Sequence, residues 1–142
     1  MEKTVRGEDN KYGWWLKSQW DHVDSIHFIG YQNPSKLRGW YERADCLVYP
    51  SRAESWGRPI SEFAPTGKPM LLVDLPYAHE TAAGAQKVSF FPLNDPLSLK
   101  EQMKALVSGR EDGLSAAPYH PVEAPKAYDW DELLAQLLPP EE

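Results

Sequence analysis

Short apolar runs that alternate with helical patterns constrain the fold of this chain more than any other feature of its sequence. The runs cover residues 25–29, 46–49, 70–73 and 88–91. Gly30 stops the first run, and Pro50 with Ser51 breaks the second. Strands separated by helices favour a parallel sheet covered on both faces. We therefore expect an α/β fold with a doubly wound parallel sheet, whose strands follow the order of these runs.

The segments between and around the runs predict helices. We expect them around residues 14–20, at 34–43, in a short stretch from Pro59, from Asn94 to Val107 and at 129–138. Pro59 suits the first turn of a helix, whereas Pro65 and Gly67 make a longer helix there unfavourable. Residues 74–85, which are rich in small side chains, are expected to form a loop. An apolar stripe is predicted at Leu97, Leu99, Met103, Leu106 and Val107.

The polar segments that follow the apolar runs should share one rim of the sheet. They are residues 30–32, 51–57 and 74–80. Ligands of parallel sheets bind at the carboxyl ends of the strands. A single cleft lined by these segments is therefore the expected binding site.

Composition excludes several classes of function. The chain has 142 residues, which suits one domain, and its net charge of -6 is interspersed, which argues against a nucleic-acid partner. Cys46 is the only cysteine, so there is no internal disulfide, and no residue cluster has the spacing of a zinc site. No apolar segment approaches the roughly 20 residues that cross a bilayer. We expect a cytoplasmic location, with any membrane contact made through a partner domain.

A few further residues carry competing interpretations. The tryptophans Trp14, Trp15 and Trp20 favour core or interface packing over a sugar-stacking platform, although their spacing alone does not choose between packing and a platform. His79 favours a local hydrogen bond over an acid/base role. Cys46 is interpreted as a small buried apolar residue rather than a nucleophile.

Two acidic residues flank the segment that contains the strongest candidates for ligand binding. Glu54 lies in the loop after the second apolar run, and Glu62 is expected in the first turn of the next helix. Gly57 between them would let a ligand approach the backbone closely. Carboxylates accept hydrogen bonds from sugar or ribose hydroxyls, which suits a nucleotide sugar. The alternative, in which Glu62 only favours the helix dipole and Glu54 is solvated, stays open on spacing alone.

Three motifs in the same order resemble a known enzyme family. They are residues 44–51, residues 54–62 (Glu-Ser-Trp-Gly-Arg-Pro-Ile-Ser-Glu) and Gly67-Lys68-Pro69. Together they resemble the E-x7-E region of family-four retaining glycosyltransferases of GT-B fold. The likeness extends to residues 28–30, 40–41, Glu80, Phe91, 95–96 and 128–130. It implies a partial Rossmann-like sheet, the C-terminal half of a GT-B fold, and transfer of a sugar with retention to a glycan or glycolipid acceptor.

The resemblance also implies roles for individual residues. Glu54 would contact the donor-sugar hydroxyls as the catalytic-site carboxylate, and Glu62 would bind the nucleotide ribose. Backbone near the sugar and phosphates would come from Ser55, Trp56 and Gly57, while Gly30 and Tyr31 would border the base. Arg58 would either assist a phosphate or point to solvent. The family needs no metal and no cofactor; the nucleoside-diphosphate sugar is the donor substrate.

The chain departs from the family pattern at its N-terminal side. Nothing matches the basic Arg and Lys pair that grips the pyrophosphate, and no acceptor-binding domain is present. We therefore expect residues 1–142 to be a single incomplete donor-binding domain, with residues 126–142 as the closing helix region, that is a truncated product or an expressed fragment. The exposed sheet edge left by missing strands would permit self-association.

Two alternatives to transfer stay open. The first is a non-catalytic fragment that binds a nucleotide sugar or only a protein partner. The second, a nucleotide-sugar epimerase of the same fold, fits the run from Glu54 to Glu62 less well.

Overall fold

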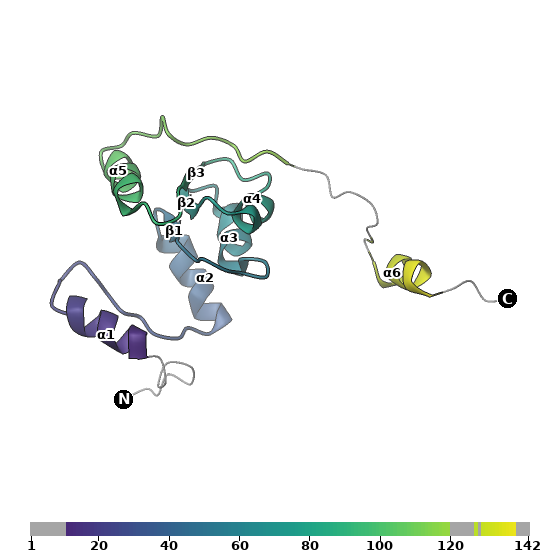
Figure 1. The fold of residues 1–142 in the computed structure, drawn as a ribbon, viewed down its shortest axis with the longest axis horizontal. Helices are drawn as coiled ribbons and strands as arrows, with labels where there is room; N and C mark the ends of the chain where they lie inside the picture. The colour runs from purple at the N-terminus through teal and green to yellow at the C-terminus, as the bar shows by residue number, and fades with distance from the viewer. Residues whose placement is uncertain (1–10, 120–126, 128, 139–142) are drawn as a thin grey trace. The chain divides into compact units, whose positions relative to one another are not determined.

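The computed structural model describes residues 11–119, 127 and 129–138. Its contacts divide the chain into two units, Met1–Asp45 and Cys46–Glu142. Helices α1 and α2 belong to the first unit, and the sheet belongs to the second (Figure 1). The candidate functional residues are distributed over both units.

Residues 11–45, the described part of the N-terminal unit, contain two helices of equal length. Helix α1 spans Lys11–Trp20, and helix α2 spans Pro34–Arg43 exactly as the sequence predicts. Asn33 caps α2, because its side-chain oxygen accepts the Lys36 N–H at 2.9 Å. Trp14, Trp15 and Trp20 are exposed rather than buried, so a core role is wrong for them and an interface role stays a prediction.

The strand predicted at residues 25–29 is wrong. These residues adopt no regular structure, and Ile26, Phe28 and Ile29 are 39%, 39% and 43% exposed. No strand within the described ranges pairs with them. A strand without a ladder partner leaves its backbone groups unpaired and is not stable on its own. Residues 30–32 consequently do not follow a strand.

The sheet of the second unit contains three parallel strands in the order β1-β2-β3. They span Leu47–Tyr49, Met70–Val73 and Val88–Phe91. The register places Tyr49 beside Leu72, and Val73 beside Phe91, so the carboxyl ends of all three strands meet at one rim. This observation confirms the α/β class and the parallel sheet predicted from these runs.

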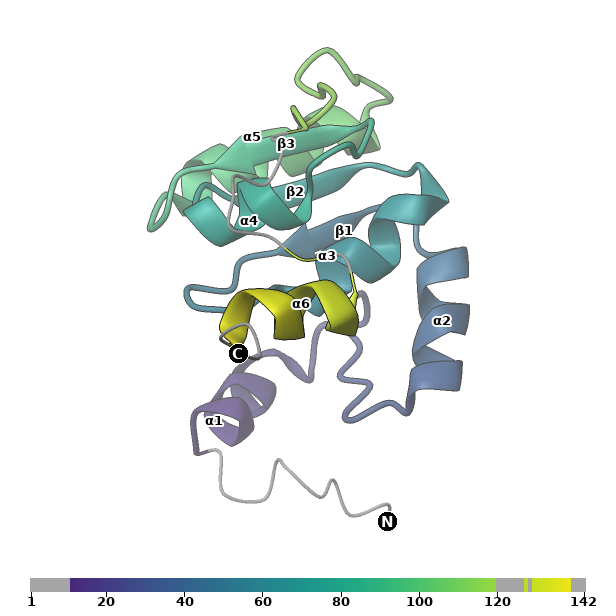
Figure 2. The ribbon, with the colours of Figure 1, turned by 90° about the vertical axis from the view of Figure 1, so that its right-hand side faces the viewer.

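Helices cover both faces of this sheet, as the alternation of side chains along a strand requires. On one face Leu71, Val73 and Phe91 form a buried cluster against helix α5, which spans Pro96–Val107. Helices α3 (Arg58–Phe63) and α4 (Pro76–Thr81) lie on the other face (Figure 2). The core therefore has one layer on each side of the strands.

Helix α3 is short because its sequence stops it. Pro59 lies in its first turn, and Ile60 and Phe63 are completely buried. The chain continues through Pro65 as a 3-10 turn, Ala64–Thr66, instead of ending directly. Gly67 then ends the segment in the left-handed conformation, with φ 67°.

The loop predicted at residues 74–85 is partly wrong, because helix α4 lies within it. Pro76 occupies the first turn, where its fixed φ favours a helix. Ala78 and Thr81 are buried on the inner side of α4. Burial against the sheet, which single-residue propensities do not reveal, fixes this helix.

Helix α5 begins at its predicted cap. Asp95 accepts hydrogen bonds from the Leu97 and Ser98 N–H groups at 3.1 and 3.0 Å. Of the predicted apolar stripe, Leu99 and Leu106 pack on the core cluster. The remaining members are exposed, namely Leu97, Met103 and Val107. Leu99 and Leu106 thus attach α5 to one face of the sheet.

The two outer strands differ in how their edges are covered. Residue Ser115 forms an antiparallel bridge with Val88 and so covers part of the β3 edge. The outer edge of β1 has no partner strand in the described part of the chain. Self-association through that edge stays a prediction.

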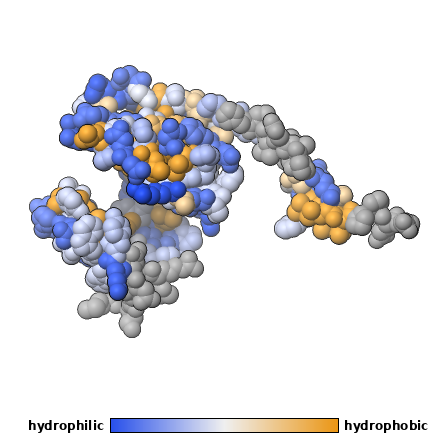
Figure 3. All heavy atoms as spheres, viewed as in Figure 1, coloured by the Kyte–Doolittle hydropathy of each residue, from blue (hydrophilic) through white to orange (hydrophobic). Residues whose placement is uncertain are grey.

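Helix α6 spans Trp130–Leu137, within the range predicted for the closing helix. Asp129 caps it through the Glu132 N–H at 2.9 Å. Its apolar side chains gather on its surface and are exposed (Figure 3); they include Trp130, Leu134 and Leu137.

Candidate functional site

Glu54 is held by two hydroxyl groups at the carboxyl end of β1. Tyr49, the last residue of that strand, donates its hydroxyl to Glu54 Oε1 at 2.5 Å. Ser51 Oγ donates to the same oxygen at 2.8 Å. No described residue donates a hydrogen bond to Glu54 Oε2. The carboxylate is therefore oriented by one oxygen and open at the other.

These contacts change the acidity of the groups involved. Hydrogen bonds from Tyr49 and then Ser51 lower the pKa of Glu54 below its usual range. Burial and then the hydrogen bond to Glu54 raise the pKa of Tyr49 well above that of a free tyrosine. Glu54 thus remains ionised in mildly acidic solution, while Tyr49 remains a protonated donor in mildly alkaline solution.

Tyr77 of helix α4 holds the loop that carries Glu54. Its hydroxyl donates to the Ser51 carbonyl oxygen at 2.6 Å. Gly57 at the other end of the loop has φ 79°, a conformation that side chains rarely adopt. A Cβ on Gly57 would lie 3.2 Å from Tyr77 Cε2 and 3.3 Å from Ile60 Cδ1. Gly57 is therefore required by both its dihedral angle and its close neighbours.

The middle of the loop is anchored by its backbone. The Thr81 hydroxyl donates a hydrogen bond to the Trp56 carbonyl oxygen. The Trp56 side chain itself is 52% exposed. A bound ligand could therefore reach the indole ring while the backbone of the loop stays fixed.

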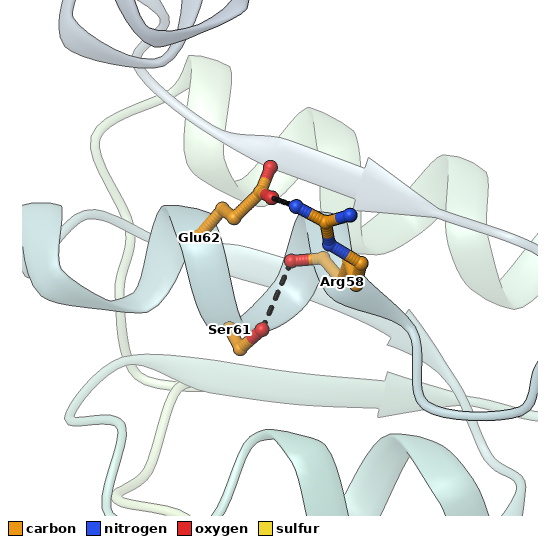
Figure 4. A network of polar contacts seen from close by, with 3 residues as sticks. All are labelled: Arg58, Ser61 and Glu62. Atoms are coloured by element: carbon orange, nitrogen blue, oxygen red, sulfur yellow. Dashed lines mark hydrogen bonds and ion pairs between the residues drawn. The ribbon is translucent and has the colours of Figure 1, made fainter. Parts of the chain in front are cut away.

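Arg58 and Glu62 form an ion pair on the outer side of helix α3. Arg58 Nη2 lies 3.0 Å from Glu62 Oε1, and Ser61 Oγ donates to the Arg58 carbonyl oxygen at 3.0 Å (Figure 4). The side chains of Arg58 and Glu62 are 79% and 36% exposed. Because α3 begins at Arg58, Glu62 lies in the second turn rather than in the first turn as predicted. The guanidinium group is thus next to the carboxylate and open to solvent.

Side chains from the other strands also meet at this rim. Arg52 Nη2 lies 2.5 Å from Asn94 Oδ1, which joins the loops after β1 and β3. His79 Nε2 lies 2.7 Å from Asp74 Oδ1, and the His79 ring stacks on Phe90 with 3.8 Å between ring centroids. The local hydrogen bond predicted for His79 is therefore present, although the residue lies in a helix.

The predicted site residues are divided between the two units. The second unit brings together Glu54, Ser55, Trp56, Gly57, Arg58 and Glu62 on one loop and the helix that follows it. Gly30, with φ 62°, and the exposed Tyr31 lie in the N-terminal unit, between α1 and α2. Their roles, like those of the other site residues, stay predictions.

Sequence reasoning missed the residues that hold Glu54. Tyr49 was predicted only as part of a strand, and Tyr77 only as part of a loop. The available signal was the position of Tyr49 at the carboxyl end of a strand, five residues before Glu54. Tyr77 lies 26 residues from Ser51, and no local pattern links the two.

Further observations on the described residues concern metal binding, membrane spanning and Cys46. They contain no group of three or more His, Cys, Asp or Glu side chains that could hold a metal ion. None of their helices is long and apolar enough to cross a membrane. Burial raises the pKa of Cys46, which packs against the core cluster but is partly buried rather than fully buried as predicted.

Comparisons with known proteins are consistent with the sheet just described. The family model described as glycosyl transferases group 1 matches residues 15–119. D-inositol 3-phosphate glycosyltransferase from Corynebacterium urealyticum is 25% identical over 114 residues, which are 80% of this chain and 27% of that relative. The chain thus spans about a quarter of the length of this curated relative. No solved structure matches the chain.

Proposed function

Because the chain belongs to the group 1 glycosyl transferases, we propose that its loop 51–57 and helix α3 bind a nucleoside-diphosphate sugar for transfer with retention to a glycan or glycolipid acceptor. Membership in this family implies a nucleotide-sugar donor. The observation that carries the proposal is the state of Glu54. Its Oε1 is held by two hydroxyls at the carboxyl end of β1, and its Oε2 can accept a ligand hydroxyl.

Each residue has a role in this proposal. Glu54 accepts a hydroxyl of the donor sugar, and its lowered pKa keeps it an acceptor at neutral pH. Glu62 accepts hydroxyls of the ribose. Arg58 next to it donates to a phosphate oxygen, since a guanidinium group matches phosphate geometry. The remaining contacts with the sugar and phosphates come from Ser55, Trp56 and Gly57.

The chemical step breaks the bond between the anomeric carbon and the leaving phosphate oxygen. The acceptor hydroxyl oxygen forms the new bond on the same face and passes its proton to the leaving phosphate oxygen, and the nucleoside diphosphate leaves with the bonding electron pair. Negative charge on the leaving phosphate is stabilised by Arg58 and by nearby N–H donors. Such fixed donors, aimed at charge that develops during the reaction, are usually the largest contribution to catalysis.

The acceptor would be held by a facing domain outside these 142 residues. This part of the proposal is supported by the extent of the match, which covers 27% of the curated relative. The open Oε2 of Glu54 is equally compatible with a second candidate function, in which the chain binds the donor without catalysing transfer. The two candidates differ in turnover and not in donor binding.

Binding of defined probes to the full 142-residue chain tests the proposal. The probes are UDP, GDP and ADP with UDP-glucose, GDP-mannose and ADP-glucose, titrated by calorimetry. We expect one nucleoside diphosphate and its conjugate to bind, while the others bind more weakly. Release of nucleoside diphosphate on addition of an acceptor extract would favour transfer over binding alone. Absence of binding by every probe, both in this chain and in a chain joined to an acceptor domain of the same family, would contradict the proposal.

A further inference from the structure

Tyr77 contacts both ends of the loop that carries Glu54. At the start of the loop, its hydroxyl donates to the Ser51 carbonyl oxygen at 2.6 Å. At the end of the loop, its ring lies against Gly57, where an added Cβ would be 3.2 Å from Cε2 and 3.3 Å from Cδ2. The Tyr77 side chain of helix α4 therefore contacts the loop at Ser51 and at Gly57, on either side of Glu54.

Ser51 connects Tyr77 with the carboxylate. Its carbonyl oxygen accepts from Tyr77, and its hydroxyl donates to Glu54 Oε1 at 2.8 Å. The same hydroxyl lies 3.4 Å from the Ala53 carbonyl oxygen, a weaker alternative acceptor. Loss of the Tyr77 contact would release the Ser51 backbone and let its hydroxyl leave Glu54.

The two hydroxyls also determine which oxygen of Glu54 can bind a ligand. Oε1 accepts from both Tyr49 and Ser51, which occupies its two lone pairs. Oε2 accepts from no residue in the described part of the chain. A sugar hydroxyl that approaches Glu54 therefore finds one available oxygen in a fixed direction, rather than a carboxylate that rotates.

We propose that Tyr77 is a positioning residue, which acts through Ser51 and Gly57 to hold Glu54 with Oε2 available for one hydroxyl of the donor sugar. This inference rests on the proposed function of Glu54. It adds that α4, which does not belong to the Glu54-to-Glu62 run, holds the carboxylate that binds the sugar. Tyr77 itself is not proposed to contact the ligand.

Two variants of the full chain separate the contacts of Tyr77. Tyr77→Phe removes the hydroxyl and keeps the ring against Gly57, whereas Tyr77→Leu removes both. Carbon-13 NMR of the Glu54 carboxyl group, recorded without ligand, reports the pKa directly. We expect this pKa to rise in Tyr77→Phe and to rise further in Tyr77→Leu, because the Ser51 hydrogen bond that lowers it is lost. Tyr119→Phe, at an exposed tyrosine, is the matched control and should leave it unchanged.

Ligand titrations of the same variants test the consequence for binding. Loss of one neutral hydrogen bond corresponds to about a fivefold change. Tyr77→Phe should therefore weaken the conjugate that binds the parent chain by about fivefold, and leave the nucleoside diphosphate alone unchanged. Equal weakening of both ligands would overturn the role in sugar binding.

The two proposals fail in different ways. If no probe binds the parent chain, the proposed function fails, and the NMR titration still decides whether Tyr77 holds Glu54. If the Glu54 pKa is the same in the parent, Tyr77→Phe and Tyr77→Leu chains, the positioning role is overturned whether or not a nucleotide sugar binds.

Discussion

Arg58 and Glu62 lie one helical turn apart on α3, with 3.0 Å between Nη2 and Oε1. Exposed pairs of this kind contribute about 0–1 kcal/mol to stability. The 79% exposure of Arg58 leaves its guanidinium group accessible to a ligand. The pair is therefore better suited to binding than to holding the fold together, and this difference can be measured.

Arg58→Ala should change binding far more than stability. We expect the free energy of unfolding in urea to fall by less than about 1 kcal/mol. Affinity for the nucleoside diphosphate should fall about 10-fold, because a charged hydrogen bond to phosphate is lost, while affinity for the nucleoside is unchanged. Lys104→Ala, which breaks the exposed pair with Glu101, is the control for stability. Equal losses for nucleoside and nucleoside diphosphate would show that Arg58 does not contact phosphate.

Tyr49→Phe should raise the pKa of Glu54. The hydrogen bond from the Tyr49 hydroxyl is the largest cause of the lowered pKa, and phenylalanine has no hydroxyl to donate it. A lowered folded-state pKa contributes stability that is present above the unfolded-state pKa and lost as the pH falls through the folded-state value. The variant should therefore lose less stability than the parent below the ordinary glutamate range. NMR titration of the Glu54 carboxyl group, with acid unfolding alongside it, checks both effects; an unchanged pKa would disprove the hydrogen bond.

Gly57→Ala should destabilise the chain more than Gly67→Ala. Both glycines have positive φ, 79° and 67°, which costs a non-glycine residue about 1–2 kcal/mol. Only Gly57 has neighbours in the way, at Tyr77 and Ile60, while the space around Gly67 is open. The difference between the two variants in urea unfolding therefore measures the packing of Tyr77 on the loop. Equal losses would mean that the Tyr77 ring moves aside without cost.

Local signals predicted much of the fold. Asn33 before Pro34 marks the start of α2, and Asp95 before Pro96 marks the start of α5, because each cap accepts a backbone N–H within four residues. Strands β2 and β3 were predicted because each is a short apolar run, and β2 is buried along its whole length. Where burial depends on distant residues, as for α4, the sequence predicted a loop. For residues 25–29, with which no strand of the described residues pairs, it predicted a strand.

The candidate site was predicted only as far as its loop. Glu54 and Gly57 could be placed in the loop after β1 because strand ends leave local signals, whereas Glu62 lies one turn further into α3 than predicted. The orientation of Glu54 depends on Tyr77, which is separated from Ser51 by 26 residues. Such a contact follows from the packing of α4 against the sheet and cannot be predicted from spacing.

The contrast between two glutamate variants tests the central claim most directly. Calorimetry of the full chain, and of the chain joined to an acceptor domain, would compare a nucleoside diphosphate with its sugar conjugate. Glu62→Ala should weaken both ligands about 10–100-fold, since the ribose is common to them, whereas Glu54→Ala should weaken mainly the conjugate by a similar factor. Glu101→Ala, an exposed glutamate in an ion pair on α5, should weaken neither. Equal losses for both ligands in both variants, or no loss in either, would contradict the assignment of Glu54 to the sugar and Glu62 to the ribose.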